Sequence, residues 1–408
     1  MSIGYRRLLS TPGAVAFTIP GFAARLPMSM LGIGVLFLVA GITHSYGIAG
    51  AVSATLTCAG ALGNPLLGRL VDRHGQRRVL VPALAVHCTA LAALIALAQV
   101  GVSDAVLFLT AAVTGAAMPP VSSLIRARWT VLLSGDPGAL NQAYSFEAVV
   151  DELVFMAGPV LVTTLATTVA PWLGLTCSGV LALVGGLIFA GRKRTEPAPT
   201  PRRSDGRRAA MAMGIAGVRL LCLACVLVGV VFGTIDVAMV AFAAAHGERG
   251  LAGLLLALVA AGSGTSGVLY GRRRWTSTLH RRFVIACALL AASMSTLRFA
   301  PSVAIMMPLA FGAGLAISPT LIAGFGLVER LVPRPMLTEG FTWVSTSLGL
   351  GVGLGVSVSG RFVDSFGASR TLLLCPCAAV AAGTLAMLGR RQIGDDGALG
   401  TARERVHL

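Results

Sequence analysis

The sequence predicts an all-α integral membrane protein with twelve transmembrane helices, and three observations support this fold class. Only 12% of the 408 residues are charged and 55% are hydrophobic, whereas about 25% of the residues of an ordinary soluble chain are charged. Apolar stretches long enough to cross a hydrocarbon core of about 30 Å as helices recur along the chain. Basic residues gather between these stretches rather than within them.

The apolar stretches fall into two groups of six, separated by a polar segment rich in Pro and Arg at 191–212. We expect this segment to be a cytoplasmic linker, because it shows no apolar periodicity. It divides an N-terminal six-helix bundle at 1–190 from a C-terminal bundle with a short cytoplasmic tail at 213–408. The expected helices are 13–42, 48–68, 79–99, 105–126, 139–168, 171–190, 213–242, 250–270, 283–299, 302–328, 338–359 and 371–389.

The distribution of Lys and Arg predicts the orientation in the membrane. If the N-terminus is cytoplasmic, 26 of the 32 basic residues lie on the cytoplasmic side and four lie in outward loops. The positive-inside rule then places both termini in the cytoplasm. The excess of Arg over Lys is typical of a GC-rich genome, and we expect a multi-pass protein of the bacterial cytoplasmic (inner) membrane. Because the basic residues form no single solvated face, the net charge of +16 does not indicate a nucleic-acid partner.

An internal repeat links the two halves of the chain. GRLVDRHGQRRVL at 68–80 and GRFVDSFGASRTL at 360–372 are identical at 7 of 13 positions. The first copy is expected inside the cell and the second outside, as in an inverted-topology repeat. The second copy has Ser365 and Ser369 where the first has Arg73 and Arg77, which agrees with an outward position. Chance similarity between two glycine-containing turns is the alternative.

The first copy resembles the signature that the major facilitator superfamily of transporters carries between helices 2 and 3. The resemblance covers nearly the whole chain and implies two six-helix bundles built from inverted three-helix repeats. It also implies that this loop holds the two bundles together on the cytoplasmic side when the protein faces outward. Gln76 departs from the signature, which usually has a basic residue there. The residues that carry the resemblance are Gly68, Asp72, Arg73, Gly75, Arg77 and Arg78.

Gly158 and Pro159, in the fifth expected helix, resemble the Gly-Pro motif of the drug/proton antiporter branches, although Val162 and Thr163 stand where small residues are expected. Proline removes a backbone donor and bends a helix, so a kink or a packing contact is the alternative interpretation. Many members of the family carry an arginine deep in helix 4, and this chain has none between Leu107 and Pro120.

Three carboxylates interrupt the same helix. At 1.5 Å per residue, Glu147 lies about 12 Å and Asp151 about 18 Å from the inner boundary. Their i,i+4 spacing places them on one face, whereas Glu152 faces another neighbour. Arg25, in the first helix, lies at about the depth of Asp151, so we expect the two to pair. Glu147 or Asp151 could then bind a transported proton; a static ion pair and direct substrate contact are the alternatives, and for Glu152 we favour a structural role.

Asp236, in the seventh expected helix, is a candidate to bind a cationic substrate or a proton, or to act as an outer gate. The eleventh helix carries Gly349, Gly351, Gly353 and Gly355, whose four-residue spacing predicts close helix packing. The eight cysteines fall in expected helices and behave there as small apolar residues, so we predict no metal and no cofactor.

We therefore expect a secondary active transporter that exports small drug-like or sugar-like molecules by alternating access in exchange for protons. Its partners would be a small-molecule substrate, protons and the lipid bilayer. A nutrient importer, as symporter or uniporter, is the alternative, and a non-transporting membrane sensor is a further one. The chain has no His-Glu-x-x-His, Gly-x-Ser-x-Gly or phosphate-loop motif, so we do not expect an enzyme.

Overall fold

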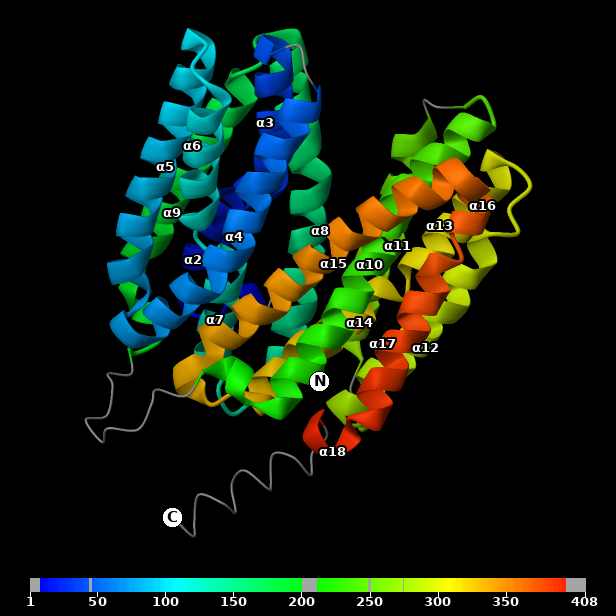
Figure 1. Ribbon diagram of the computed structural model, residues 1–408. Coiled ribbons are helices and arrows are strands. Elements are labelled where there is room, and N and C mark those ends of the chain that lie inside the picture. Colours follow the sequence, from blue (N-terminus) through cyan, green and yellow to red (C-terminus); the bar gives the residue numbers. More distant parts are fainter. Residues whose placement is uncertain (1–7, 44–45, 200–210, 249–250, 274, 394–408) are drawn as a thin grey trace. The chain divides into compact units, whose positions relative to one another are not determined.

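The computed structural model describes residues 8–43, 46–199, 211–248, 251–273 and 275–393, and all regular elements in these ranges are helical (Figure 1). The helices and helix pairs form twelve membrane-length segments, as predicted. Ten of them are long and apolar enough to cross a membrane by length and composition. The other two, α4 and α12, are also long enough but contain more polar residues. The expected all-α membrane fold is confirmed.

The first six segments lie before the linker. They are α2 (Ala14–Arg25) with α3 (Pro27–Thr43), α4 (Tyr46–His74), α5 (Gln76–Val100), α6 (Asp104–Ala116) with α7 (Val121–Leu132), α8 (Pro137–Thr168) and α9 (Leu173–Gly191).

The last six segments follow the linker and end in a short helix, α18 (Arg390–Ile393). They are α10 (Ala216–Ala245), α11 (Ala252–Arg272), α12 (Leu279–Leu297), α13 (Val303–Gly314) with α14 (Ile317–Leu331), α15 (Leu337–Phe366), and α16 (Ala368–Thr371) with α17 (Leu374–Leu388).

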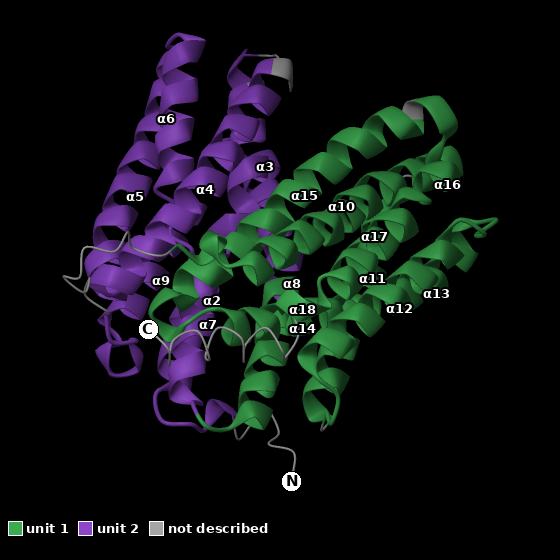
Figure 2. Cartoon of the chain, turned by 60° about the horizontal axis from the view of Figure 1, so that its bottom comes forward, with its two compact units in different colours: residues 1–5, 135–152, 209–408 green, residues 6–134, 153–208 purple. Residues whose placement is uncertain are grey.

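The chain divides into two compact units, coloured separately in Figure 2. Unit 2 contains Arg6–Ser134 and Leu153–Arg208, and its largest apolar core is formed by α3, α4, α5, α6 and α9. Unit 1 contains Gly135–Glu152 and Ala209–Leu408, and α10, α11, α12, α13 and α17 build its core. The residues of α8 up to Glu152 therefore belong with unit 1. The domain limits at 190 and 213 remain a prediction, and the linker residues 200–210 and the tail 394–408 lie outside the described residues.

Prolines explain three of the interruptions within membrane-length segments. α2 ends at Arg25, two residues before Pro27, and Met118-Pro119-Pro120 separates α6 from α7. Between α13 and α14 the break falls at Leu315 and Ala316. There Pro319 cannot donate a backbone hydrogen bond to the preceding turn.

The two copies of the internal repeat fold alike. Gly75 follows α4 with φ 91° and ψ 154°, and Gly367 follows α15 with φ 80° and ψ 166°. Each donates its backbone N–H to the residue four positions earlier, Val71 or Val363, at 2.8 and 2.9 Å. This backbone conformation is essentially restricted to glycine, so the shared glycine is explained by the shared turn.

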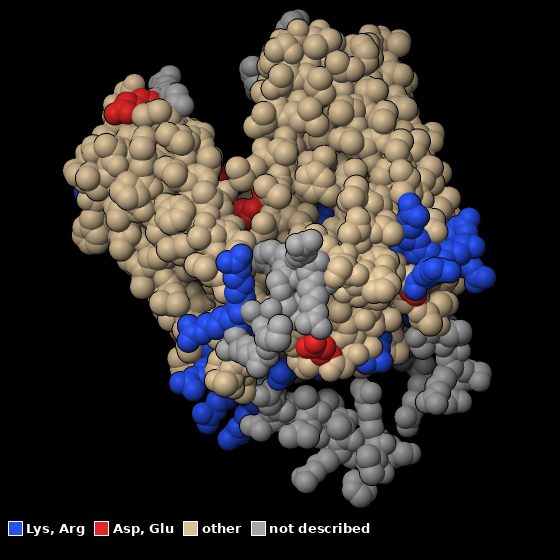
Figure 3. Space-filling view, turned by 180° about the vertical axis from the view of Figure 1, so that it is seen from behind, with Lys and Arg blue, Asp and Glu red and all other residues tan. Residues whose placement is uncertain are grey.

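The surface has the character expected of lipid contact. Large apolar side chains are exposed along the outer helices, among them Leu62 on α4, Leu109 on α6 and Leu388 on α17. Figure 3 shows long stretches of surface without charged side chains, and Lys and Arg gathered in the lower part of each unit in that view. Exposed basic residues near helix ends include Arg77, Arg78, Arg192, Lys193, Arg194, Arg272, Arg273 and Arg281.

Candidate intramembrane acid site

Unit 1 contains all three carboxylates of the fifth membrane segment. Glu147 is fully buried, while Asp151 and Glu152 are half-buried. All three lie near the middle of α8, a single helix of 32 residues. Burying a charge at this depth costs about 2.5–3.5 kcal/mol on insertion scales, so each carboxylate needs polar partners, a proton or water.

The partners of Glu152 come from two other helices of unit 1. The Ser263 hydroxyl on α11 donates to Glu152 Oε1 at 2.6 Å. The hydroxyls of Ser263 and Ser318, on α14, are 3.0 Å apart and hydrogen-bonded. Both serines are completely buried. The neighbour of Glu152 is therefore a pair of hydroxyl groups that sequence reasoning had not singled out. That Glu147 and Asp151 face another neighbour remains a prediction.

Glycines let these helices approach closely. A Cβ at Gly262 on α11 would collide with the Phe311 carbonyl oxygen, and one at Gly314 would collide with the Val259 carbonyl oxygen. A Cβ at Gly267 would lie 3.1 Å from both Ser318 Oγ and a methyl group of Val149 on α8. Gly262 and Gly314 thus bring α11 against α13, and Gly267 lets α8, α11 and α14 meet beside the hydroxyl pair.

Arg25, predicted to pair with Asp151, lies at the end of α2 in unit 2. Its side chain is almost fully buried, at 1% exposure, and its Nε donates to the Gly21 carbonyl oxygen at 3.3 Å. Arg25 and Asp151 belong to different units, and their pairing remains a prediction.

Asp236, the other predicted site residue, is an exposed residue of α10 in unit 1. Two residues earlier, Thr234 accepts a hydrogen bond from the Ser359 hydroxyl on α15 at 2.9 Å, and both are fully buried. This contact fixes the rotation of α10 against α15. Asp236 is held on another face of α10, and its role as a substrate, proton or gate residue remains a prediction.

The turn between α4 and α5 carries the residues of the predicted cytoplasmic motif. Gly68 and Gly75 are buried, Asp72 and Arg73 are half-buried, and Arg77 and Arg78 are exposed.

Glu196, just after α9, contacts this turn. Its Oε1 accepts from the Arg77 backbone N–H at 2.9 Å and would lie 3.1 Å from a Cβ at Gly75. The turn is therefore tied to the start of the linker within unit 2.

Arg128, on α7, is the buried centre of the region around this turn. Its Nε donates to Gln76 Oε1 at 2.7 Å, and its other nitrogens donate to the Arg192 and Phe189 carbonyl oxygens and to Thr195 Oγ1. The guanidinium carbon lies 3.9 Å from the centre of the Phe189 ring. Gln76, the residue that departs from the family signature, is thus a neutral partner of a buried cation.

Gly158, on α8, is a packing site in unit 2. A Cβ there would collide with the Ser29 hydroxyl of α3. The Ser29 hydroxyl donates to the carbonyl oxygens of Leu26, at 3.0 Å, and of Val154, at 2.8 Å. Pro159 follows inside α8, which continues as one helix to Thr168. The predicted roles of Gly158 and Pro159 in a kink or in antiport remain predictions.

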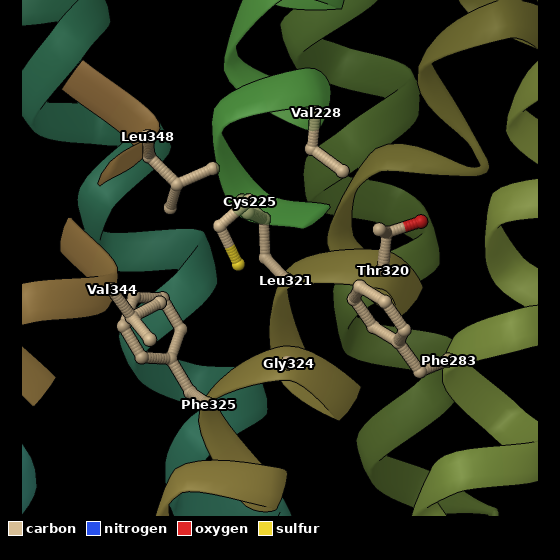
Figure 4. Close-up of a pocket in the computed structure, with 9 residues that line it drawn as sticks. All are labelled: Cys225, Val228, Phe283, Thr320, Leu321, Gly324, Phe325, Val344 and Leu348. Carbon is tan, nitrogen blue, oxygen red and sulfur yellow. The ribbon is translucent and has the colours of Figure 1, made fainter. Parts of the chain in front are cut away.

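A small cavity in unit 1 has room for about one water molecule. Figure 4 shows it between α10, α12, α14 and α15, with the Cys225 sulfur and the rings of Phe283 and Phe325 around it. Its lining is almost wholly apolar, so it is a packing void rather than a substrate site. Among the described residues, no group of three or more His, Cys, Asp or Glu could hold a metal ion.

Helices of membrane length in both units define a multi-pass membrane protein. The family model of the Major Facilitator Superfamily matches residues 18–272, more than half of the chain. The chain belongs to the major facilitator superfamily. No curated protein shows a significant match to the sequence.

Solved structures share the fold. The human organic anion transporter MFSD10 (TETRAN) has a TM-score of 0.72 and 16% identity, with 92% of this chain and 99% of that chain covered. A bacterial homologue of the iron transporter ferroportin, in an outward-facing state, has a TM-score of 0.71 and 15% identity, with 91% and 98% covered. The transporter FucP, in an outward conformation, has a TM-score of 0.63 and 12% identity, with 91% and 99% covered. At these identities the likeness concerns the fold.

Proposed function

We propose that this protein is a secondary active exporter that moves small molecules, drug-like or sugar-like, out of a bacterial cell in exchange for protons. The observation that carries the proposal is the set of ionisable groups in the middle of α8, where Glu147 is fully buried and Asp151 lies one turn further on. Intramembrane carboxylates are costly, and in membrane proteins they mark substrate and proton paths.

Alternating access couples the two movements in this proposal. A carboxylate that binds a proton from outside becomes neutral, and it releases the proton inside when water reaches it. Asp151 is the first candidate for this role, and Arg25 would favour its ionised form. Asp72, Arg73, Arg77 and Arg78 would hold the cytoplasmic side closed while the substrate leaves.

The substrate class is open because the same fold serves unlike cargo. The structural relatives include a transporter of organic anions and a homologue of an iron transporter. Specificity depends on the side chains that line the path, not on the fold. An importer that uses the same carboxylates would run in the opposite direction.

The test compares wild type with Asp151→Asn, expressed at matched levels in an efflux-deficient bacterium. The accumulation of a panel of antibiotics, dyes and sugars is measured with and without a proton uncoupler. We expect wild type to lower the accumulation of at least one compound, and the uncoupler or Asp151→Asn to abolish the effect. Asp104→Asn, at the start of α6, is the matched control and is expected to behave as wild type.

Other outcomes separate the alternatives. If wild type and Asp151→Asn export equally, Asp151 is structural and Glu147, Glu152 and Asp236 become the candidates for coupling. If wild type raises accumulation, the protein is an importer. If it changes nothing for any compound, a non-transporting sensor is favoured.

A further inference from the structure

The hydroxyl pair beside Glu152 has a chemistry that the proposed function does not yet use. Ser263 and Ser318 are both fully buried, come from different helices, and form one continuous line of oxygen atoms with Glu152 Oε1. The steps of this line are 2.6 and 3.0 Å. The first falls in the range of about 2.5–2.7 Å that is typical of hydroxyl–carboxylate hydrogen bonds.

Two glycines and a helix break shape the place where these helices meet. Gly267 leaves room for Ser318 and Val149 at the same point, and Gly314 brings the α13–α14 segment against α11 beside the Ser263 backbone nitrogen. The break at Leu315 and Ala316 places Ser318 in the first turn of α14. Backbone N–H groups in the first turn of a helix favour nearby negative charge.

A hydroxyl group can donate and accept, whereas an ionised carboxylate can only accept. When Glu152 is ionised, the Ser318 hydroxyl donates to Ser263 and the Ser263 hydroxyl donates to Glu152. When Glu152 takes up one proton, its new O–H donates to Ser263, and the Ser263 hydroxyl turns to donate to Ser318. The same three oxygens therefore satisfy both protonation states, and only hydrogen atoms reorient.

We propose that Glu152 is a proton-binding carboxylate of this protein and that Ser263 and Ser318 are its positioning residues. The inference rests on the proposed function, because an exporter that exchanges protons needs a group that binds them. It differs from the sequence-based interpretation, which favoured a structural role for Glu152 and placed the proton on Glu147 or Asp151.

The charges around Glu152 in unit 1 are few. On α8 they are Asp151, its neighbour in sequence, and Glu147, more than one turn earlier. The charged residue of α11 is Arg272, nine residues beyond Ser263. On α14 they are Glu329 and Arg330, at least eleven residues beyond Ser318. From these two helices the Ser263 hydroxyl donates to the carboxylate, and the Ser318 hydroxyl is bonded to Ser263.

The experiment is infrared difference spectroscopy of the purified full-length protein in lipid, titrated with pH, which needs no substrate. We expect a carboxylic-acid carbonyl band that titrates in wild type and is missing in Glu152→Gln. In Ser263→Ala the midpoint of this band should move by about one to two pH units toward higher pH, because the ionised carboxylate loses a hydrogen bond of the strength typical for charged groups. Ser263→Thr keeps the hydroxyl and should restore the wild-type midpoint.

Two controls make the result specific. Ser318→Ala removes the second hydroxyl and should move the midpoint in the same direction by less. Ser266→Ala removes another buried hydroxyl of α11, one that donates to the Ser263 carbonyl oxygen instead of to Glu152, and should leave the midpoint unchanged.

The proposal is overturned if no titrating band is sensitive to Glu152, or if Ser263→Ala titrates as wild type. If Glu152→Gln does not fold, Ser263→Ala still tests the proposal, because it removes a single oxygen atom and is a smaller change to the packing. The outcome is separate from that of the export assay. A shifted band without any export by wild type would contradict the proposed function alone, and export with an unshifted band would contradict this inference alone.

Discussion

At the scale of single residues, Gln76 shows how a departure from a motif can be explained by one contact. The sequence identifies Gln76 only as a neutral residue where a basic one is usual. The structure shows it almost fully buried, at 1% exposure, where its Oε1 accepts from Arg128 and its Nε2 donates to the Leu124 carbonyl oxygen. Arg128 lies 52 positions away in the sequence, so this pairing could not be predicted without the fold.

Replacing Gln76 by the basic residue of the family signature should therefore destabilise this protein. In Gln76→Arg a second cation would stand beside the buried Arg128 guanidinium. Breaking a buried, charged hydrogen-bond network in this way costs about 3–5 kcal/mol. We expect the melting temperature of the purified protein in detergent to fall by several degrees. The control is Arg77→Gln, a change at the exposed neighbour, which should alter it little; equal melting of Gln76→Arg and wild type would contradict the assigned contact.

The acid site shows the same limit of sequence reasoning. The carboxylates of α8 were recognised because charged residues are rare in apolar spans, and the face of Glu152 followed from the helical period. Ser263 and Ser318 carry no such signal, since isolated serines are common in membrane helices. They lie 111 and 166 positions after Glu152, and only the packing of α11 and α14 brings them to it.

At the scale of elements, the glycines of α15 divide by helical phase. Cβ atoms at Gly351 and Gly355 would collide with or crowd the Val226 and Val230 carbonyl oxygens of α10, whereas Gly349 and Gly353 face open space. The sequence predicted close packing from the four-residue spacing, but both pairs have that spacing. Which pair faces α10 depends on the rotation of α15, and the Ser359–Thr234 hydrogen bond shows that rotation.

This division predicts opposite effects for the same substitution two residues apart. Gly351→Ala would force α10 and α15 apart, and overpacking of this kind costs about 1–3 kcal/mol. Gly353→Ala adds a methyl group in open space and should stabilise the helix by about 0.5–1 kcal/mol. Thermal unfolding of the two purified variants in one detergent measures the difference. A Gly353→Ala variant that is less stable than Gly351→Ala would show that the α10–α15 interface is assigned to the wrong face.

At the scale of the whole molecule, the fold was predictable because a bilayer leaves few solutions. Backbone groups in lipid must be satisfied within the segment, so each apolar stretch of membrane length becomes a helix. Helix interruptions were less predictable, since the proline near each break does not by itself decide between a kink and an end. The substrate is a property of side chains gathered from many helices, which no local pattern in this sequence describes.

The predicted orientation of the molecule can be tested on one residue. Lys193 is the only lysine of the sequence, and it lies exposed in the short 3-10 helix Lys193–Thr195 after α9. Arg128 holds this helix to its unit through the Arg192 carbonyl oxygen and Thr195 Oγ1. The residue that carries the side-chain amine, Lys193, is therefore held at a defined position just after α9, where the linker begins. The positive-inside rule places that end in the cytoplasm.

A membrane-impermeant, amine-reactive reagent should therefore label the peptide that contains Lys193 in inside-out vesicles and leave it unlabelled in right-side-out vesicles. Mass spectrometry of the digested protein separates this peptide from the N-terminal amine, and Lys193→Arg should remove the signal. After detergent is added, the peptide should be labelled equally in both vesicle preparations, which shows that the amine itself is reactive. Labelling only in right-side-out vesicles would show that the orientation is the reverse of the predicted one. The turn at Gly75 would then be extracellular, and the basic residues Arg73, Arg77 and Arg78 could not close a cytoplasmic gate.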